Sequence, residues 1–245
     1  MKALIFAAGL GERMRPLTEH TPKPLLEAGG KPLIAWQLEK LAAIGVRDVV
    51  INTSWLADRF PEVLGSGDRW DLRLHYSYEG ERALETGGGM WHALDWLRDR
   101  DAPEAPFIAV NGDIHSDYDF ARLPQEPAGN AHLVLVDNPP QHPSGDFALD
   151  GSQVQDRAGA RLTFSGIGMY RPALLRDWRR VIGDVEGVDS SRPRFKLAPL
   201  LYAAVGAGRV TGEHHRGSWT DVGTPQRLAA LDASIRQAAA DTGRD

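Results

Sequence analysis

The most constraining feature of this chain is the segment that follows its first apolar stretch. Residues 2–8, Lys-Ala-Leu-Ile-Phe-Ala-Ala, predict a strand and lead directly into residues 9–18, Gly-Leu-Gly-Glu-Arg-Met-Arg-Pro-Leu-Thr. Two glycines let the backbone turn tightly and present amide N–H groups to an anion. Three nearby cations, Arg13, Arg15 and Lys23, supply the positive charge that a triphosphate requires, and prolines on both sides hold Lys23 in a stiff, extended segment. The sequence therefore predicts a phosphate-binding loop after the first strand.

Two familiar phosphate loops are excluded by position. A P-loop requires Gly-Lys-Ser/Thr after four intervening residues, and the segment lacks it. A dinucleotide fingerprint requires a third glycine where Met14 stands. It also requires an acidic residue at the end of the second strand, where Asn52 follows Val49-Val50-Ile51. Binding of a nicotinamide dinucleotide is therefore not expected.

Composition limits the class of protein. The 245 residues are 42% hydrophobic and 25% charged, as in globular proteins, and no run of about 18 apolar residues is present. The net charge of −5 argues against general nucleic-acid binding, because such proteins usually carry an excess of Lys and Arg. The chain has no cysteine, and its N-terminus is already a strand rather than a signal peptide. We expect a cytoplasmic protein, monomeric or a small homo-oligomer, without nucleic-acid or membrane partners.

Strand and helix signals alternate along the chain. Apolar runs predict strands at residues 3–7, 49–51, 72–76, 107–110 and 132–136. Helical patterns lie between several of these runs, and such alternation predicts a parallel, doubly wound sheet. The expected fold class is α/β with a Rossmann-like, doubly wound mixed sheet.

Four helices are expected along the chain. One begins at Pro32 and ends before Gly45, and a second spans about residues 55–64. A third follows Gly87-Gly88-Gly89, and the last begins at Pro225. Their apolar residues recur at helical spacing, so we expect these stripes to form core rather than a cofactor site.

The loop and three later motifs resemble the signature of the sugar-1-phosphate nucleotidyltransferases, also called nucleoside-diphosphate-sugar pyrophosphorylases. The later motifs are Glu85-Thr-Gly-Gly88, Asn111-Gly-Asp113 and Trp219-x-Asp221-x-Gly-Thr224, so the resemblance covers almost the entire chain. It implies the nucleotide-diphospho-sugar transferase fold. It also implies that a sugar phosphate attacks the α-phosphorus of a nucleoside triphosphate and that pyrophosphate leaves.

Within the family, four segments are most similar to the uridylyltransferase branch of cell-wall recycling. They are residues 9–15, 84–89, 136–139 and 217–223. The resemblance implies UTP and N-acetylmuramate α-1-phosphate as substrates. Muramate carries a lactyl carboxylate, so its pocket should offer a hydrogen-bond donor or a cation that the triphosphate does not occupy. The candidates are Arg82, Arg192, Arg194 and Lys196.

Other functions stay open at this point. A glucose- or mannose-1-phosphate nucleotidyltransferase would share much of the binding machinery, and phosphocholine cytidylyltransfer is a more distant alternative. A catalytically silent sensor of nucleotide sugars is a further one. The motif residues Arg13, Lys23, Asp113 and Asp221 argue against a silent protein.

The cations have specific expected roles. No general base is needed, because the second pKa of a phosphate monoester is about 6 and the nucleophile is already anionic. Repulsion between two polyanions is the obstacle, and positive charge at the reacting phosphates relieves it. We expect Arg13 to bind the β- and γ-phosphates, and Lys23 to bind the α-phosphate and the sugar phosphate. Arg15 belongs either to this cluster or to a surface salt bridge.

Two aspartates are the expected ligands of Mg²⁺. Asp113 follows the predicted strand 107–110, at a carboxyl end where α/β sheets bind ligands. Mg²⁺ commonly takes one or two carboxylates plus phosphate oxygens, and Asp221 matches the second metal aspartate of the family. The alternative roles are a turn residue for Asp113 and an acid beside the last helix for Asp221.

The base is expected along residues 7–9 and beside residues 79–88, and the resemblance implies that Glu79, Glu85 and Thr86 line the base and sugar site. Small residues allow the backbone to approach a flat ring. The nucleotide-binding candidates are Ala7, Ala8, Gly9, Gly11, Arg13, Lys23, Glu79 and Gly88. The sugar-binding candidates are Glu85, Thr86, Asn111, Asp146 and Lys196. A solvated acid for Glu79 or Glu85, a helix-entry glycine for Gly88 and a turn residue for Asp146 are the alternatives.

The expected organisation is a single nucleotidyltransferase domain of residues 1–245. Residues 1–136 and 196–245 would form the nucleotide and metal core. Residues 137–195, with Pro- and Gly-rich turns and short strands, would form a small sugar-binding subdomain over the nucleotide half.

Overall fold

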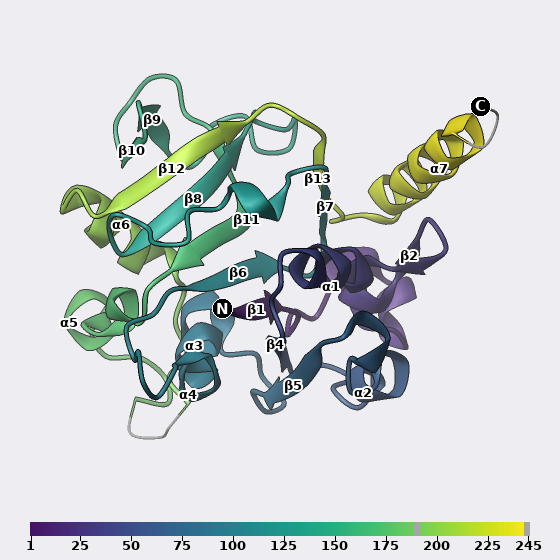
Figure 1. Cartoon of the computed structure of the whole chain (residues 1–245), viewed down its shortest axis with the longest axis horizontal. Helices are drawn as coiled ribbons and strands as arrows, with labels where there is room; N and C mark the ends of the chain where they lie inside the picture. The colour runs from purple at the N-terminus through teal and green to yellow at the C-terminus, as the bar shows by residue number, and fades with distance from the viewer. Residues whose placement is uncertain (189–191, 243–245) are drawn as a thin grey trace.

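The computed structural model describes residues 1–188 and 192–242 (Figure 1). Within these ranges the centre of the molecule is a nine-stranded mixed sheet with the order β5-β4-β1-β6-β11-β8-β12-β10-β9. The five strands expected from the sequence all lie in this sheet, close to their expected ends. They are β1 (Lys2–Phe6), β4 (Asp48–Thr53), β5 (Arg73–Tyr78), β6 (Phe107–Asn111) and β8 (Ala131–Val136). The predicted α/β class with a mixed, doubly wound sheet is confirmed.

Strand direction divides the sheet into two halves. β5, β4, β1 and β6 pair in parallel. β11 (Thr163–Tyr170) then runs antiparallel between β6 and β8, and β12 (Val210–His215) lies parallel to β8. β10 (Gln153–Gln155) and β9 (Ala148–Asp150) complete the sheet as an antiparallel edge.

Segment 137–195, expected as a subdomain over the nucleotide half, contributes a strand to the middle of the sheet. The short strands expected within it include β11, which has an irregularity between Phe164 and Ile167. β11 lies between β6 and β8 because Ile167 and Met169 are completely buried and continue the core. Part of the segment, residues 189–191, lies outside the described residues. The division into a nucleotide core and a sugar-binding subdomain stays a prediction.

Helices cover both faces of the sheet (Figure 1). α1 (Leu33–Ala43) and α2 (Arg59–Leu64) pack on one face, in a core that includes Ala3 and Ile5 of β1. Leu4, which points to the opposite face, packs in the core of the other helices. Those helices are α3 (Glu85–His92), α4 (Leu94–Leu97), α5 (Trp178–Ile182) and α6 (Ala198–Gly206).

Helix ends differ from expectation at two places. α1 follows Pro32 and ends before Gly45, as expected. α2 begins only at Arg59, because residues 55–58 form turns. The glycines of residues 87–89 lie inside α3 and do not precede it.

The remaining elements are short, apart from the C-terminal helix. They comprise two small antiparallel pairs, β2 (Glu27–Ala28) with β3 (Lys31–Pro32) and β7 (Ile114–Ser116) with β13 (Trp219–Asp221). The 3₁₀ turns are Glu12–Met14, Leu17–Glu19, Lys23–Leu25, Asp68–Trp70, Phe120–Arg122 and Pro172–Leu175.

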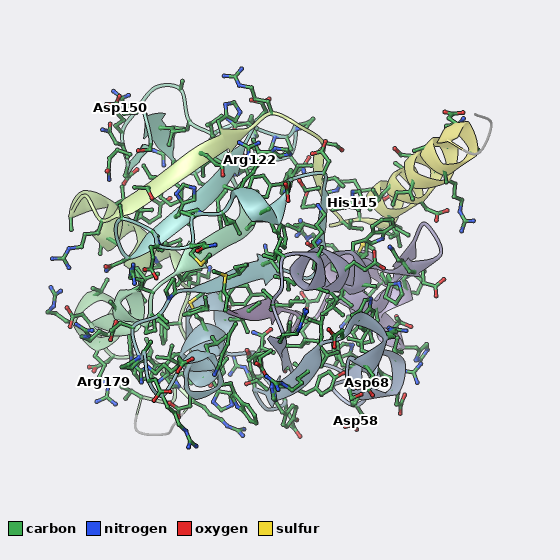
Figure 2. All side chains as sticks on the ribbon, in the orientation of Figure 1. Asp58, Asp68, His115, Arg122, Asp150 and Arg179 are labelled. Carbon is green, nitrogen blue, oxygen red and sulfur yellow. The ribbon has the colours of Figure 1, made fainter. Side chains whose placement is uncertain are left out.

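The final helix, α7 (Pro225–Thr242), extends away from the sheet (Figure 1). Its Leu231 and Ile235 pack in a third apolar cluster with Ala28 of β2. Charged side chains such as Asp58, Asp68 and Arg179 lie on the outside of the molecule (Figure 2). Among the described helices, none combines the length and apolar character needed to cross a membrane.

Candidate active site

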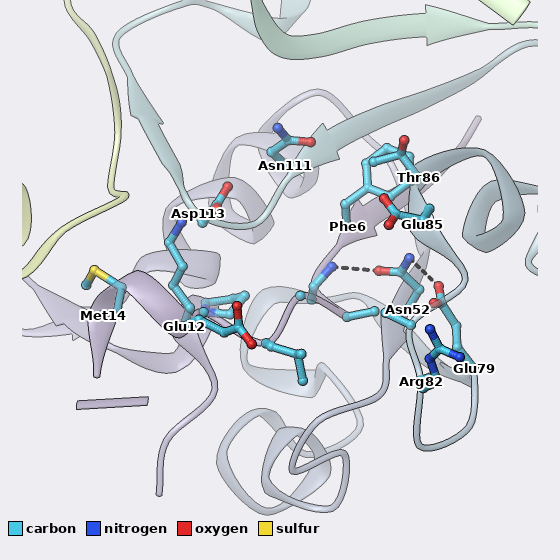
Figure 3. Close-up of a pocket in the computed structure, with 18 of the residues that line it drawn as sticks. Phe6, Glu12, Met14, Asn52, Glu79, Arg82, Glu85, Thr86, Asn111 and Asp113 are labelled. Atoms are coloured by element: carbon cyan, nitrogen blue, oxygen red, sulfur yellow. Dashed lines mark hydrogen bonds and ion pairs between the residues drawn. The ribbon is translucent and has the colours of Figure 1, made fainter. Parts of the chain in front are cut away.

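A cavity of about 750 Å³ lies at the carboxyl ends of the parallel strands (Figure 3). Phe6 ends β1, Asn111 ends β6, and Asn52 lies near the end of β4; all three line the cavity. β4 lies on one side of β1 and β6 on the other, so the winding of the chain reverses here. Open α/β sheets bind ligands at such a switch point, and the volume is typical of small-molecule sites.

The predicted phosphate loop forms one wall of this cavity. Gly11 has a φ of +63°, and its carbonyl oxygen accepts hydrogen bonds from the Met14 N–H and the Thr18 hydroxyl, both at 2.8 Å. A Cβ on Gly11 would lie 2.9 Å from Cγ2 of Thr18, so the fold requires glycine there. At Gly9, in contrast, no described atom lies within 4 Å of the position that a Cβ would take. A ligand can therefore approach the backbone at Gly9, and Ala7 and Ala8 line the same wall.

The three cations of the loop differ in their position relative to the cavity. Arg13 and Lys23 line the cavity, whereas the exposed Arg15 does not. Lys23 is largely buried, with 11% of its side chain exposed, and its ammonium forms an ion pair with Asp113. Two of the cations are therefore available to a ligand in the cavity.

Asp113 directly precedes β7, and Asp221 ends the neighbouring strand β13. β7 and β13 pair so that Asp221 lies opposite Ile114, and the Val222 N–H donates to the Asp113 carbonyl oxygen at 2.9 Å. The Asp113 carboxylate lines the cavity. Asp221 does not line the cavity, although Gly223, two residues further along the chain, does. The two predicted metal ligands are therefore brought to the same region of the fold.

Each of these carboxylates is already paired with a cation. Lys23 holds Asp113, and Arg227 of α7 holds Asp221. Gln141 Nε2 also donates to Asp221 at 2.7 Å. Within the described residues, no group of three or more His, Asp or Glu side chains could hold a metal. A metal here would need substrate oxygens to complete its coordination, as is usual for Mg²⁺.

A buried carboxylate, that of Glu79, forms part of the cavity wall. Glu79 is only 2% exposed, and its two carboxylate oxygens accept hydrogen bonds from Asn52 Nδ2 and from the Leu84 N–H, each at 2.6 Å. Asn52 Oδ1 accepts from the Ala7 N–H, also at 2.6 Å (Figure 3). Burial raises the pKa of Glu79 to about 7, although both hydrogen bonds act in the opposite direction. Glu79 borders the cavity as predicted, but its oxygens are engaged by the protein.

Three of the predicted sugar-binding candidates also line the cavity. They are Glu85, Thr86 and Asn111 (Figure 3). Glu85 has a φ of +63°, in the left-handed region that side chains disfavour, and Arg194 binds its carboxylate at 2.8 Å. Arg194 also donates to the Ala83 carbonyl oxygen at 3.1 Å, so its guanidinium fixes the backbone before α3.

Three further candidates lie away from the cavity wall. A Cβ on Gly88 would lie 2.2 Å from the carbonyl oxygen of Pro193, so this glycine serves the packing of α3. Asp146 accepts from the Phe164 N–H at 2.8 Å, so its carboxylate binds the backbone of β11. Lys196 is exposed and does not border the cavity. The structure does not bring these residues to the site.

Sequence reasoning overlooked two residues of the site region. Asn52 served only to exclude dinucleotide binding, although its place at the end of a predicted strand was a usable signal. Arg227 carries no such signal, since its pairing with Asp221 depends on how α7 leaves β13.

Comparison with known proteins agrees with this geometry. Residues 2–148 match the nucleotidyl transferase family. The chain is 43% identical over 241 residues to the N-acetylmuramate alpha-1-phosphate uridylyltransferase of Neisseria meningitidis serogroup B, covering 95% of this chain and 97% of the relative. It is 34% identical over 252 residues to the protein of the same name from Caulobacter vibrioides, covering 96% and 97%.

A solved structure shows the same fold. It is the crystal structure of a candidate glucose-1-phosphate thymidylyltransferase from Bacillus anthracis in complex with sucrose, with a TM-score of 0.80 and 20% identity. The match covers 96% of this chain and 95% of that one. Together, the family match and the two relatives show that this chain belongs to the nucleotidyl transferase family, among the sugar-1-phosphate nucleotidyltransferases.

Proposed function

We propose that this protein transfers a uridylyl group from UTP to N-acetylmuramate α-1-phosphate, giving UDP-N-acetylmuramate and pyrophosphate. The observation that carries the proposal is the 43% identity, over 95% of the chain, to a relative with that name. The reaction would recycle a cell-wall sugar in the cytoplasm, where nucleoside triphosphates are made.

The phosphate loop supports this chemistry. A triphosphate seated against Gly9 and Gly11 would meet the guanidinium of Arg13 at its β- and γ-phosphates and the ammonium of Lys23 at its α-phosphate. The attacking sugar phosphate is already ionised at neutral pH, so no side chain has to remove a proton. The task of the two cations is to reduce repulsion as the polyanions meet and to stabilise the departing pyrophosphate.

We propose Mg²⁺ as the metal, with Asp113 and Asp221 as its protein ligands. Two aspartates whose backbones lie side by side, one of them on the wall of the cavity, are a donor set that suits this ion. When bound, Mg²⁺ would neutralise phosphate charge. Lys23 and Arg227 balance the charges of the two carboxylates, and Lys23 would exchange Asp113 for a substrate phosphate.

The four candidate partners of the lactyl carboxylate differ in whether they line the cavity. Of the four candidate cations, Arg82 and Arg194 line the cavity, whereas the exposed Arg192 and Lys196 do not. The side chain of Arg82 is 69% exposed, and that of Arg194 is 36% exposed and is positioned by Glu85 and Ala83. We therefore propose that Arg194 binds the carboxylate that distinguishes muramate from glucose and N-acetylglucosamine.

The test is pyrophosphate release with UTP, GTP, dTTP and CTP, each combined with the 1-phosphates of N-acetylmuramate, N-acetylglucosamine, glucose and mannose, and with phosphocholine. We expect the highest kcat/KM for UTP with N-acetylmuramate 1-phosphate. A preference for glucose or mannose 1-phosphate would overturn the acceptor assignment and favour the related pyrophosphorylases. Binding of a nucleotide sugar without turnover of any pair would indicate a sensor.

A further inference from the structure

Three hydrogen bonds connect the ends of three neighbouring parallel strands. They run from the Ala7 N–H after β1 to Asn52 of β4, from Asn52 to Glu79 after β5, and from the Leu84 N–H to Glu79. Each donor–acceptor distance is 2.6 Å, and the two side chains are 3% and 2% exposed. The bonds therefore join the phosphate-loop wall of the cavity to the segment that leads into α3.

The direction of each bond is dictated by its backbone end. The Ala7 N–H can only donate, so the atom of Asn52 that faces it is the amide oxygen, and the amide nitrogen must face Glu79. The Leu84 N–H can also only donate, so Glu79 must accept twice. A carboxamide followed by a carboxylate satisfies this order completely.

The same pair is in contact with α3. A Cβ on Gly89 would lie 2.3 Å from Glu79 Oε1 and 2.7 Å from Asn52 Nδ2, so the helix packs directly on the two side chains. Glu79 and Asn52 border the cavity, but their hydrogen-bonding atoms are directed to the protein. Their influence on a ligand would act through the backbone at Ala7 and Leu84.

We propose that Asn52 and Glu79 are positioning residues that fix the width of the nucleotide-binding half of the cavity. The pair holds the backbone of residues 7–9 at a set distance from residues 84–86. This rests on the proposed function, in that a nucleoside triphosphate is taken to bind between these two segments. Loss of the pair would weaken nucleotide binding without removing any group that touches the nucleotide.

A reversal of polarity tests the proposal. Asn52→Asp places a carboxylate against Glu79, and Glu79→Gln turns one of the two required acceptors into a donor. In the double variant N52D/E79Q, the new aspartate accepts from the Ala7 N–H and from the glutamine amide, while the glutamine oxygen accepts from the Leu84 N–H. All donors then have acceptors again, with the bond between the two side chains reversed.

Calorimetric titration with UTP and Mg²⁺, without acceptor, is the primary measurement. We expect each single variant to raise the Kd about tenfold or more, because one buried group loses its partner. The double variant should return to within about threefold of the unmodified protein, as a compensating pair requires. Steady-state kinetics should show the same pattern in KM for UTP and much smaller changes in kcat.

Asp48→Asn is the matched control. Asp48 lies at the opposite end of β4, where it pairs with Arg73 at 2.6 Å, and its loss should lower the melting temperature without changing the Kd. Single variants that lower the melting temperature but leave the Kd unchanged would overturn the proposal, and so would a double variant no better than either single one. A failure of the proposed function is distinguishable, because the unmodified protein would then not bind UTP. If it binds another triphosphate instead, the Kd values of the same variants are compared with that triphosphate.

Discussion

The ammonium of Lys23 forms an ion pair with the carboxylate of Asp113, a residue 90 positions away in the sequence. The two side chains are 11% and 32% exposed and lie on the wall of the same cavity. A cation suited to phosphate and an acid suited to Mg²⁺ therefore neutralise each other at the site where both substrates are proposed to bind. Substrate phosphate would compete with Asp113 for Lys23, so the pair links binding of the anion to release of the carboxylate.

Asp113→Asn and Asp221→Asn should each lose most turnover at limiting Mg²⁺ while the protein stays folded. Each change removes ligand charge with little change in volume. Turnover measured as a function of Mg²⁺ concentration, with the melting temperature as a check of folding, gives the answer. Full activity of either variant at limiting Mg²⁺ would remove that aspartate from the proposed metal site.

Lys23→Ala should lower kcat about a hundredfold or more, whereas Arg15→Ala should change it little. Lys23 lines the cavity and faces the proposed reacting phosphates, but Arg15 is exposed outside the wall. Single-turnover rates with saturating UTP would compare the two. Equal losses of kcat would contradict the proposal that Lys23, and not Arg15, acts on the reacting phosphates.

Arg194→Ala should lower kcat/KM for N-acetylmuramate 1-phosphate about ten- to a hundredfold, since a hydrogen bond to a charged group is worth about 1.5–3 kcal/mol. The value for N-acetylglucosamine 1-phosphate should change much less, because that sugar lacks the lactyl carboxylate. Arg192→Ala, a nearby exposed arginine that does not line the cavity, is the matched control. A similar loss for both sugars would mean that Arg194 acts only by holding Glu85 and Ala83 in place.

The raised pKa of Glu79 predicts a pH-dependent stability. Burial, with a smaller contribution from Glu85, raises the pKa from 4.5 to about 7, so the folded protein binds a proton more tightly than the unfolded chain does. The contribution of this group to the free energy of unfolding is therefore largest below pH 4.5 and is lost as the pH rises through about 7.

Urea unfolding of the unmodified protein and of Glu79→Gln between pH 4 and 8 measures this effect. The free energy of unfolding of the unmodified protein minus that of Glu79→Gln should fall by about 3 kcal/mol as the pH rises from 4 to 8. The prediction concerns this change and not the value of the difference at any one pH. A difference that does not vary with pH would show that Glu79 is ionised equally in the folded and unfolded states.

The sequence alone predicted features whose causes are local. The parallel strands follow from short apolar runs, and the limits of α1 follow from Pro32 and Gly45. The phosphate loop also follows from nearby residues, since a Cβ at Gly11 would collide with the side chains of Thr18 and Lys23. The rule that ligands bind at strand ends was enough to place Asn111 and Asp113 on the cavity wall.

Tertiary structure decided the features that depend on residues far apart in the chain. The sequence pattern of Gly87 and Gly88 indicates entry to a helix, but both residues lie inside α3. These positions require glycine because Pro193 and Phe195 pack too closely against them to leave room for a Cβ. The strand β11 reads as part of a peripheral segment, yet it completes the centre of the sheet.

The same limit applies to the site. A strand pattern places Asn52 and Glu79 near strand ends, but only the order of strands in the sheet puts β4 between β1 and β5 and lets the two side chains meet. Likewise, the motifs supply Lys23 and Asp113, while the fold turns them into an ion pair. The sequence determined which charged and polar side chains are available to the site, because residue type and local conformation depend on residues nearby in the chain. The tertiary structure determined their partners, because burial and long-range packing decide which donor reaches which acceptor.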